Sequence, residues 1–132
     1  MNENALIYEY AVLRYVPRIE REEFINIGLL MVCKRCRWLR GAVTLDPARI
    51  LAFDPGADIE ALERQTAMFD PAAGALAECT AEERFRWFSA VKSSILQTSR
   101  PHPGLIDTDG SADPSSLLEA TFLRLYKTLV LP

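Results

Sequence analysis

The sequence has little of what a secreted, membrane-spanning or strongly basic protein carries. It has three cysteines, an odd number, and one histidine. The formal net charge of −3 excludes a globally basic nucleic-acid binder but leaves room for a local basic patch. No apolar run approaches the ~18 residues that a membrane helix needs, and the first residues form no positively charged leader. We therefore expect reduced thiols, no membrane partner and a cytoplasmic location.

The sequence also lacks the short motifs that mark common catalytic sites. It has no Gly-rich phosphate loop, no His-x-Glu pair and no serine–histidine–carboxylate spacing. Cys33 and Cys36 form a C-x-x-C, to which Cys79 and His102 would add the ligands of a Cys₃His zinc site. One close pair and two distant single residues do not define such a site, so we predict free thiols, no metal and no cofactor. The absence of these motifs favours a protein that performs no catalysis, although the sequence does not exclude an enzyme.

What the sequence does contain is a change of hydrophobic period near its middle. Alternating apolar residues predict strands over 7–16, 24–33 and 38–45, and the first is expected to be central because both of its faces are apolar. Asp46-Pro47 is expected to stop the third strand. Spacings of three and four predict helices beginning at Asp58, Thr80 and Asp113, with a fourth strand over 93–99. Residues 101–104 are expected to be extended or to form a turn.

These elements predict the fold class. The 132 residues should form a single α+β domain over 1–132. Three contiguous strands favour a mostly antiparallel sheet of about four strands, with about three helices packed mainly on one face. A parallel doubly wound fold would need regular alternation of strands and helices, which is missing.

A polar cluster is predicted where the first two strands meet. If they form a hairpin, strand pairing places Arg14 across from Asn26 and Val12 across from Gly28, all on one face. A glycine at this position admits the close approach of a backbone, a side chain or a ligand. Arg14 would be a cation on a mostly apolar face, and such a group needs a partner.

Two interpretations of this cluster follow. In one, Arg14 forms a structural ion pair with Glu22 or Glu23, and the Asn26 amide bonds the backbone of the turn. In the other, an enzyme or binder of a phosphorylated small molecule holds its anionic ligand here, with help from the fourth strand and the segment after it. The candidate binding residues are Arg14, Arg21, Glu23, Asn26, Gln97, Thr98 and His102.

A second candidate site is the turn between the second and third strands. Its members are Lys34, Arg35, Arg37, Trp38 and Arg40. Basic side chains interleaved with an aromatic ring can bind a phosphate backbone and stack a base, so nucleic acid is one candidate partner. The same charges on an exposed hairpin also prevent edge strands from pairing with other chains. Trp38 could equally anchor a protein partner.

Two separated segments resemble the signatures of one family. They are the run from Tyr10 to Pro17 with the run from Arg21 to Gly28, and the run from Ser93 to Ser99 with His102, Gly104 and Leu105. Together they resemble an uncharacterised bacterial family, catalogued as domain of unknown function 3037. The resemblance covers nearly the whole chain and brings no established activity. It implies a non-enzymatic accessory or regulatory module that binds another protein, such as a neighbouring kinase similar to the persister-type serine/threonine toxins.

Overall fold

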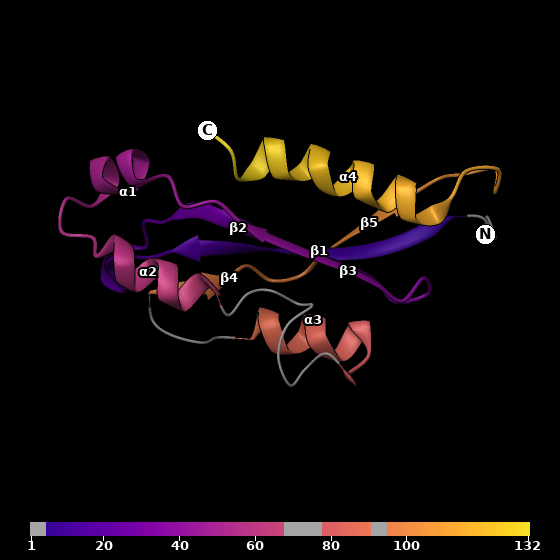
Figure 1. Cartoon of the computed structure of the whole chain (residues 1–132), viewed down its shortest axis with the longest axis horizontal. Helices are drawn as coiled ribbons and strands as arrows, with labels where there is room; N and C mark the ends of the chain where they lie inside the picture. The colour runs from indigo at the N-terminus through magenta and orange to yellow at the C-terminus, as the bar shows by residue number, and fades with distance from the viewer. Residues whose placement is uncertain (1–4, 68–77, 91–94) are drawn as a thin grey trace.

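The protein is built on a five-stranded antiparallel sheet (Figure 1). The computed structural model describes residues 5–67, 78–90 and 95–132. The strands are, in chain order, β1 (Leu6–Tyr15), β2 (Ile25–Cys33), β3 (Trp38–Val43), β4 (Leu96–Thr98) and β5 (His102–Ile106). β1 pairs with β2 on one side and with β5 and β4, at its two ends, on the other, while β3 pairs with β2. The predicted α+β class and the central position of the first strand are confirmed.

The fifth strand lies where only an extended segment or turn was expected. β5 pairs antiparallel with the first half of β1, which places Gly104 opposite Tyr8. Pro103 is accommodated because the outer side of β5 has no partner strand in the described part of the chain. A Cβ at Gly104 would lie 2.1 Å from the Tyr8 ring, so only glycine leaves room for that ring. β4 is shorter than the predicted strand, of which residues 93 and 94 lie outside the described part.

Each α-helix begins at a side chain that caps its first turn. Asp46, Asp58, Thr80 and Asp113 accept hydrogen bonds from backbone N–H groups there. The helices are η1 (Ile19–Arg21, 3₁₀), α1 (Pro47–Phe53), α2 (Ile59–Thr66), α3 (Ala81–Ser89) and α4 (Pro114–Leu129). α1 was not predicted, because Asp46-Pro47 was interpreted as the end of a strand and is instead an N-cap with a first-turn proline. The described helices are too short or too polar to cross a membrane.

Helices cover both faces of the sheet, where the prediction placed them mainly on one (Figure 1). α4 packs on the first face, where Phe122 joins a core with Val12 of β1. α3 packs on the second face, where Phe85 lies in a core with Ala11. Leu62 of α2 lies in a third core further along that face. Alternate residues of β1 point to opposite faces and are apolar on both, so each face needs its own cover.

Candidate functional site

The structure brings three of the predicted site residues together on adjacent strands. Arg14 of β1 lies opposite Asn26 of β2 and opposite Gln97 of β4. The predicted pairing of Arg14 with Asn26 is confirmed. Paired residues of neighbouring strands present their side chains to the same face, and Asn26 reaches the end of α4, so this row lies on the α4 face of the sheet.

The predicted pairing of Gly28 is wrong by one residue. The register shifts between Leu13 and Arg14, so that Gly28 lies opposite Leu13 and Val12 lies opposite Leu29. A Cβ at Gly28 would lie 2.9 Å from the carbonyl oxygen of Ala42. The glycine therefore admits the backbone of β3 and provides no space for a ligand.

Arg14 is held by an aromatic ring and not by a carboxylate. Its guanidinium carbon lies 4.2 Å from the centre of the Phe24 ring. Among the described residues no carboxylate forms an ion pair with it; Glu23, one of the expected partners, pairs with Arg21. The Nε atom of Arg14 is buried and has no hydrogen-bond partner in the part of the chain that the structure describes. The expected structural ion pair is therefore wrong, and a half-buried cation stands without a counter-charge.

Asn26 binds the C-terminal end of α4. Its Nδ2 donates to the carbonyl of Leu129 at 2.9 Å. Arg49 of α1 donates to the carbonyl of Val130 at 2.9 Å and to that of Asn26 at 3.3 Å. The last carbonyls of a helix have no partner within it, and a cation favours the negative end of the helix dipole. Sequence reasoning missed Arg49 because it missed α1, and it expected Asn26 to bond the hairpin turn instead.

The remaining members of the predicted cluster lie elsewhere. Thr98 follows Gln97 and so points to the opposite face, where its hydroxyl donates to the carbonyl of Ser89 at 2.5 Å. His102 lies opposite Tyr10, and the two ring centres are 5.3 Å apart. Tyr10 precedes Arg14 by four strand residues, which is about 13 Å at about 3.3 Å per residue. Thr98 and His102 therefore do not join Arg14 in one site.

A cavity of about 400 Å³ opens between the β1–β2 connection and the end of α1. It is lined by Pro17, Arg18, Arg21, Glu23, Phe53, Asp54 and Pro55. Asp54 accepts a hydrogen bond from the Tyr15 hydroxyl at 2.6 Å. Burial, that hydrogen bond and the charge of Asp54 raise the pKa of Tyr15 to about 12, so the phenol is neither a base nor a nucleophile near neutral pH. The cavity can hold a side chain or small molecule, but its groups do not form a set for acid–base catalysis.

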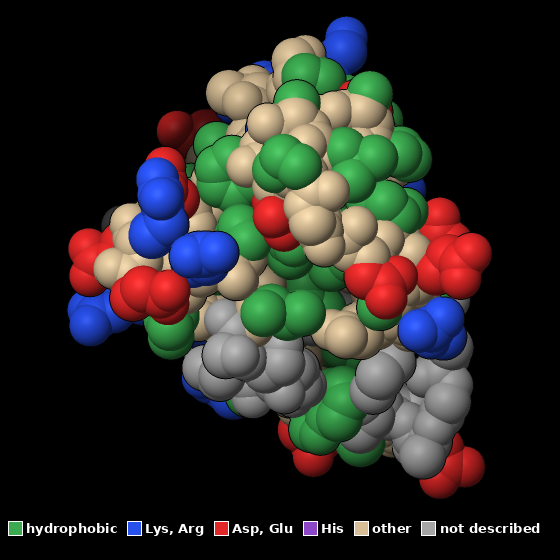
Figure 2. Space-filling view, turned by 90° about the vertical axis from the view of Figure 1, so that its left-hand side faces the viewer, with side chains coloured by type: hydrophobic (Ala, Val, Ile, Leu, Met, Phe, Trp, Pro, Cys, Tyr) green, Lys and Arg blue, Asp and Glu red, His purple; other side chains and the backbone are tan. Residues whose placement is uncertain are grey.

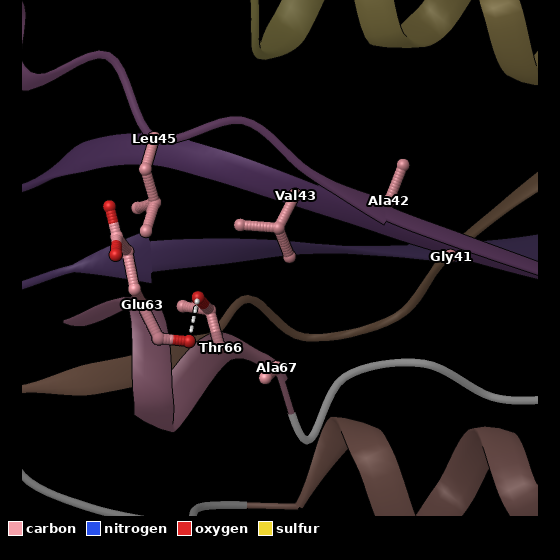
Figure 3. A pocket seen from close by; sticks show the side chains of 7 residues that line it. All are labelled: Gly41, Ala42, Val43, Leu45, Glu63, Thr66 and Ala67. Carbon is pink, nitrogen blue, oxygen red and sulfur yellow. Dashed lines mark hydrogen bonds between the residues drawn. The ribbon is translucent and has the colours of Figure 1, made fainter. Parts of the chain in front are cut away.

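A second cavity, of about 390 Å³, lies between β3 and α2 (Figure 3). It is lined by Gly41, Ala42, Val43, Leu45, Glu63, Thr66 and Ala67. The Thr66 hydroxyl donates to the carbonyl of Leu62 at 2.7 Å, within its own helix, and lies 3.4 Å from that of Glu63. Glu63 is the one ionisable residue of this lining. A single carboxylate on a mostly apolar wall does not indicate a reaction.

Large apolar side chains are exposed at the end of the molecule that carries Arg14. Four of the eight large hydrophobic residues exposed in the described part belong to the β1–β2 connection, α1 and the segment after α4. These four, which we call the end face, are Ile19, Phe24, Leu51 and Leu131. Figure 2 shows hydrophobic side chains spread across this end, with acidic side chains among them and charged side chains of both signs toward its margins. The hydrogen bonds from Asn26 and Arg49 to the end of α4 hold β2, α1 and the C-terminal segment next to one another.

The tip of the β2–β3 hairpin is only partly free to bind another molecule. Lys34 pairs with Glu82 at 3.1 Å, and the hydrogen bonds from Lys34 and Arg86 lower the pKa of Glu82. Arg35 donates to the carbonyl of Ala5 at 3.3 Å. Arg37 is exposed and has a left-handed backbone, with φ of 53°. Of these three basic residues, two are already engaged within the chain.

The other two members of the predicted nucleic-acid surface pack under α4. Arg40 pairs with Glu119 at 3.2 Å and lies 4.9 Å over the Phe122 ring. Trp38 meets the same ring edge-on, with the ring centres 6.5 Å apart. A base could stack on Trp38 only if the indole left this packing, and a phosphate would compete with Glu119 for Arg40. The described contacts give no support to a nucleic-acid surface.

The cysteines do not form a metal centre in the described part of the chain. No three His, Cys, Asp or Glu side chains gather there as a metal ion would require. Cys33 is buried, and both Cys36 and Cys79 are partly exposed free thiols. Burial and the adjacent Cys33 raise the pKa of the Cys36 thiol, which lowers the fraction of reactive thiolate.

The fold and these contacts define a small α+β protein with exposed apolar side chains at the end that carries Arg14, an arginine with no counter-charge among the described residues. The chain belongs to the family described as "Protein of unknown function (DUF3037)", whose model matches residues 10–130. The predicted family resemblance is therefore confirmed over most of the chain. No curated protein and no solved structure matches the chain.

Proposed function

We propose that this protein is a cytoplasmic accessory module that binds another protein through the end face and performs no catalysis itself. The observation that carries the proposal is the exposure of Ile19, Phe24, Leu51 and Leu131 on the segments at the end of the molecule that carries Arg14, whose guanidinium lies over the Phe24 ring. Exposed apolar residues scattered singly are ordinary, whereas apolar side chains gathered at one site and rimmed by charge mark interaction surfaces.

The chemistry of this surface suits a protein more than a metabolite. Phe24 is 42% exposed and offers a rigid aromatic contact of the kind that contributes strongly at interfaces. The adjoining cavity of about 400 Å³ could receive one side chain of a partner. Its charged groups are largely paired, since Glu23 binds Arg21 and Asp54 binds Tyr15. The end face therefore offers apolar contact area and a few polar groups that could orient a bound protein.

The family resemblance implies a kinase-like protein encoded by a neighbouring gene, and this protein is the first partner to test. Ile19 and Ile7 provide a matched pair of probes, because they are 58% and 57% exposed, and Ile7 lies near the start of β1 whereas Ile19 lies in η1, beyond the other end of that strand. Ile19→Asp places a charge on the end face, and Ile7→Asp places the same charge outside it. The purified proteins would be mixed and the complex measured by isothermal titration calorimetry, after circular dichroism has shown that each variant is folded.

The proposal expects a complex that Ile19→Asp weakens by at least about tenfold, or about 1.4 kcal/mol, and that Ile7→Asp leaves within about twofold. Equal weakening by both substitutions would mean that the end face is not the docking surface. Absence of any complex at about 50 µM of each folded protein would contradict binding to this partner.

A further inference from the structure

We infer that Arg14 is the specificity-determining residue of the end face, and that it binds an aspartate or glutamate carboxylate within an apolar segment of the partner. This inference rests on the proposed function and names the chemistry of the ligand. It predicts an interaction in which the charge of Arg14 selects the partner and the apolar side chains of the end face supply contact area.

The state of the Arg14 guanidinium points to a missing anion. The side chain is half-buried, its Nε atom is withdrawn from water without a partner, and among the described residues no carboxylate pairs with it. A buried donor that makes no hydrogen bond is unfavourable. The Phe24 ring lies over the guanidinium and stabilises its charge, but it makes no hydrogen bond with the N–H groups. The N–H groups lie in the plane of the guanidinium and the ring lies above that plane, so an anion can bind them edge-on while the ring stays stacked.

The surroundings favour a carboxylate over a phosphate. The other cation that reaches this row of residues is Arg49, and it already donates to the carbonyls of Asn26 and Val130. The C-terminal end of α4, bound by Asn26, carries partial negative charge. Among the described residues of this row, Arg14 is a cation without a hydrogen bond to a carbonyl or a carboxylate, and a single such cation beside that negative end suits a monoanion better than a dianion. A carboxylate also matches the two-pronged geometry of a single guanidinium.

The neighbour of Arg14 favours a peptide as the source of that carboxylate. The Oδ1 atom of Asn26 is buried and accepts no hydrogen bond from the described residues, so an acceptor unpaired among them lies across the strands from a donor in the same state. An acidic residue within a peptide can satisfy both groups, because its carboxylate accepts hydrogen bonds from the guanidinium and a backbone N–H group of the peptide can donate to the Asn26 oxygen. Phe24 is 42% exposed, so a segment bound edge-on to the guanidinium can also contact its ring. The exposed apolar side chains around it then contact the flanking residues.

The test uses two synthetic peptides that differ in one group, Ac-Ala-Leu-Glu-Phe-Ala-NH₂ and the same peptide with glutamine for glutamate. Each would be titrated into the ¹⁵N-labelled protein, with the backbone amides and the arginine Nε–H signals followed by NMR. We expect the glutamate peptide to shift the Arg14 Nε–H signal and the amides of the end face, and to bind at least about fivefold more tightly than the glutamine peptide.

Three variants separate recognition from folding. Arg14→Gln should bring the two peptides to within about twofold of each other, and Arg14→Lys should keep part of the preference because it keeps the charge without the planar fork. Arg124→Gln removes an equally positive group from the exposed surface of α4 and should leave the preference intact. Equal binding of the two peptides, absence of binding up to about 10 mM, or shifts confined to other surfaces would overturn the inference.

The outcome also separates this inference from the proposed function. If the binding of a protein partner falls with Ile19→Asp but not with Arg14→Gln, the end face is still supported as a docking surface. The inference that Arg14 binds a carboxylate of the partner would then be wrong. A preference for the glutamate peptide, without any complex with the kinase-like protein, would leave the carboxylate site standing and show that the partner is a different protein.

Discussion

Arg14 and Phe24, ten residues apart around the β1–β2 connection, stack so that the guanidinium carbon lies 4.2 Å from the ring centre. This contact shows how a strand with two apolar faces tolerates an arginine. The ring replaces some of the hydration that the cation loses, and it does so without neutralising the charge. The charge is therefore not neutralised, and it lies at the end of the molecule that carries half of the large apolar side chains exposed in the described part of the chain.

We predict that Arg14 and Phe24 are energetically coupled. In a double-mutant cycle with Arg14→Met and Phe24→Leu, the free energies of unfolding in urea should show a coupling of about 0.5–1 kcal/mol. The cycle of Phe24→Leu with Arg124→Met is the control, because Arg124 is exposed on α4. Additive effects in the first cycle would show that the stacking contributes nothing to stability.

Gly104 should be intolerant of even a methyl group. A Cβ there would lie 2.1 Å from the Tyr8 ring across the β1–β5 pair, so Gly104→Ala must displace the ring or the strand. We expect a loss of about 2–3 kcal/mol in the free energy of unfolding. Gly56→Ala is the matched control, because the nearest atom to its Cβ would be 3.7 Å away, and it should change stability by less than about 0.5 kcal/mol. Similar losses at the two sites would mean that the Tyr8 ring does not lie over Gly104.

The last turn of α4 should depend on Asn26. Asn26→Ala removes the donor to the carbonyl of Leu129, and we expect a loss of about 1–2 kcal/mol, with faster hydrogen exchange at the amides of Val130 and Leu131. Thr128→Ala is the control, because its exposed hydroxyl bonds only the carbonyl of Arg124 within the same helix. Unchanged exchange in Asn26→Ala would show that the cap does not hold the helix end.

The parts of the fold that local patterns determine were predictable from the sequence. The pairing of Arg14 with Asn26 follows from a hairpin between neighbouring strands, and the capping box of Thr80 and Glu83 follows from their spacing. The one-residue shift at Leu13 was not predictable, because the apolar residues on both faces of β1 fit either register. Pro103 discouraged the prediction of a strand that its position at the sheet edge permits.

The site was less predictable than the fold because its contacts join distant parts of the chain. The hydrogen bond from Asn26 to Leu129 spans 103 residues, and the one from Arg49 to Val130 spans 81. No local spacing indicates that a hairpin asparagine meets the end of the last helix. The nearest acidic residues in sequence suggested an ion pair for Arg14, whereas the fold directs Glu23 to Arg21 and places the Phe24 ring over Arg14.

The burial of the Tyr15 phenol, together with its hydrogen bond to Asp54, should make stability fall at alkaline pH. The pKa of Tyr15 is raised to about 12 in the folded protein, from about 10 in an unfolded chain. Between these values the unfolded chain releases a proton that the folded protein keeps, so this contribution is complete below pH 10 and is lost as the pH rises toward 12. Tyr15→Phe lacks it, and the unfolding free energies of the wild type and this variant should therefore converge over that interval. Asp54→Asn removes the carboxylate and should move the loss to lower pH, as measured by urea unfolding and tyrosinate absorbance. A constant difference between wild type and Tyr15→Phe from pH 9 to pH 12 would show that the phenol is not held by Asp54.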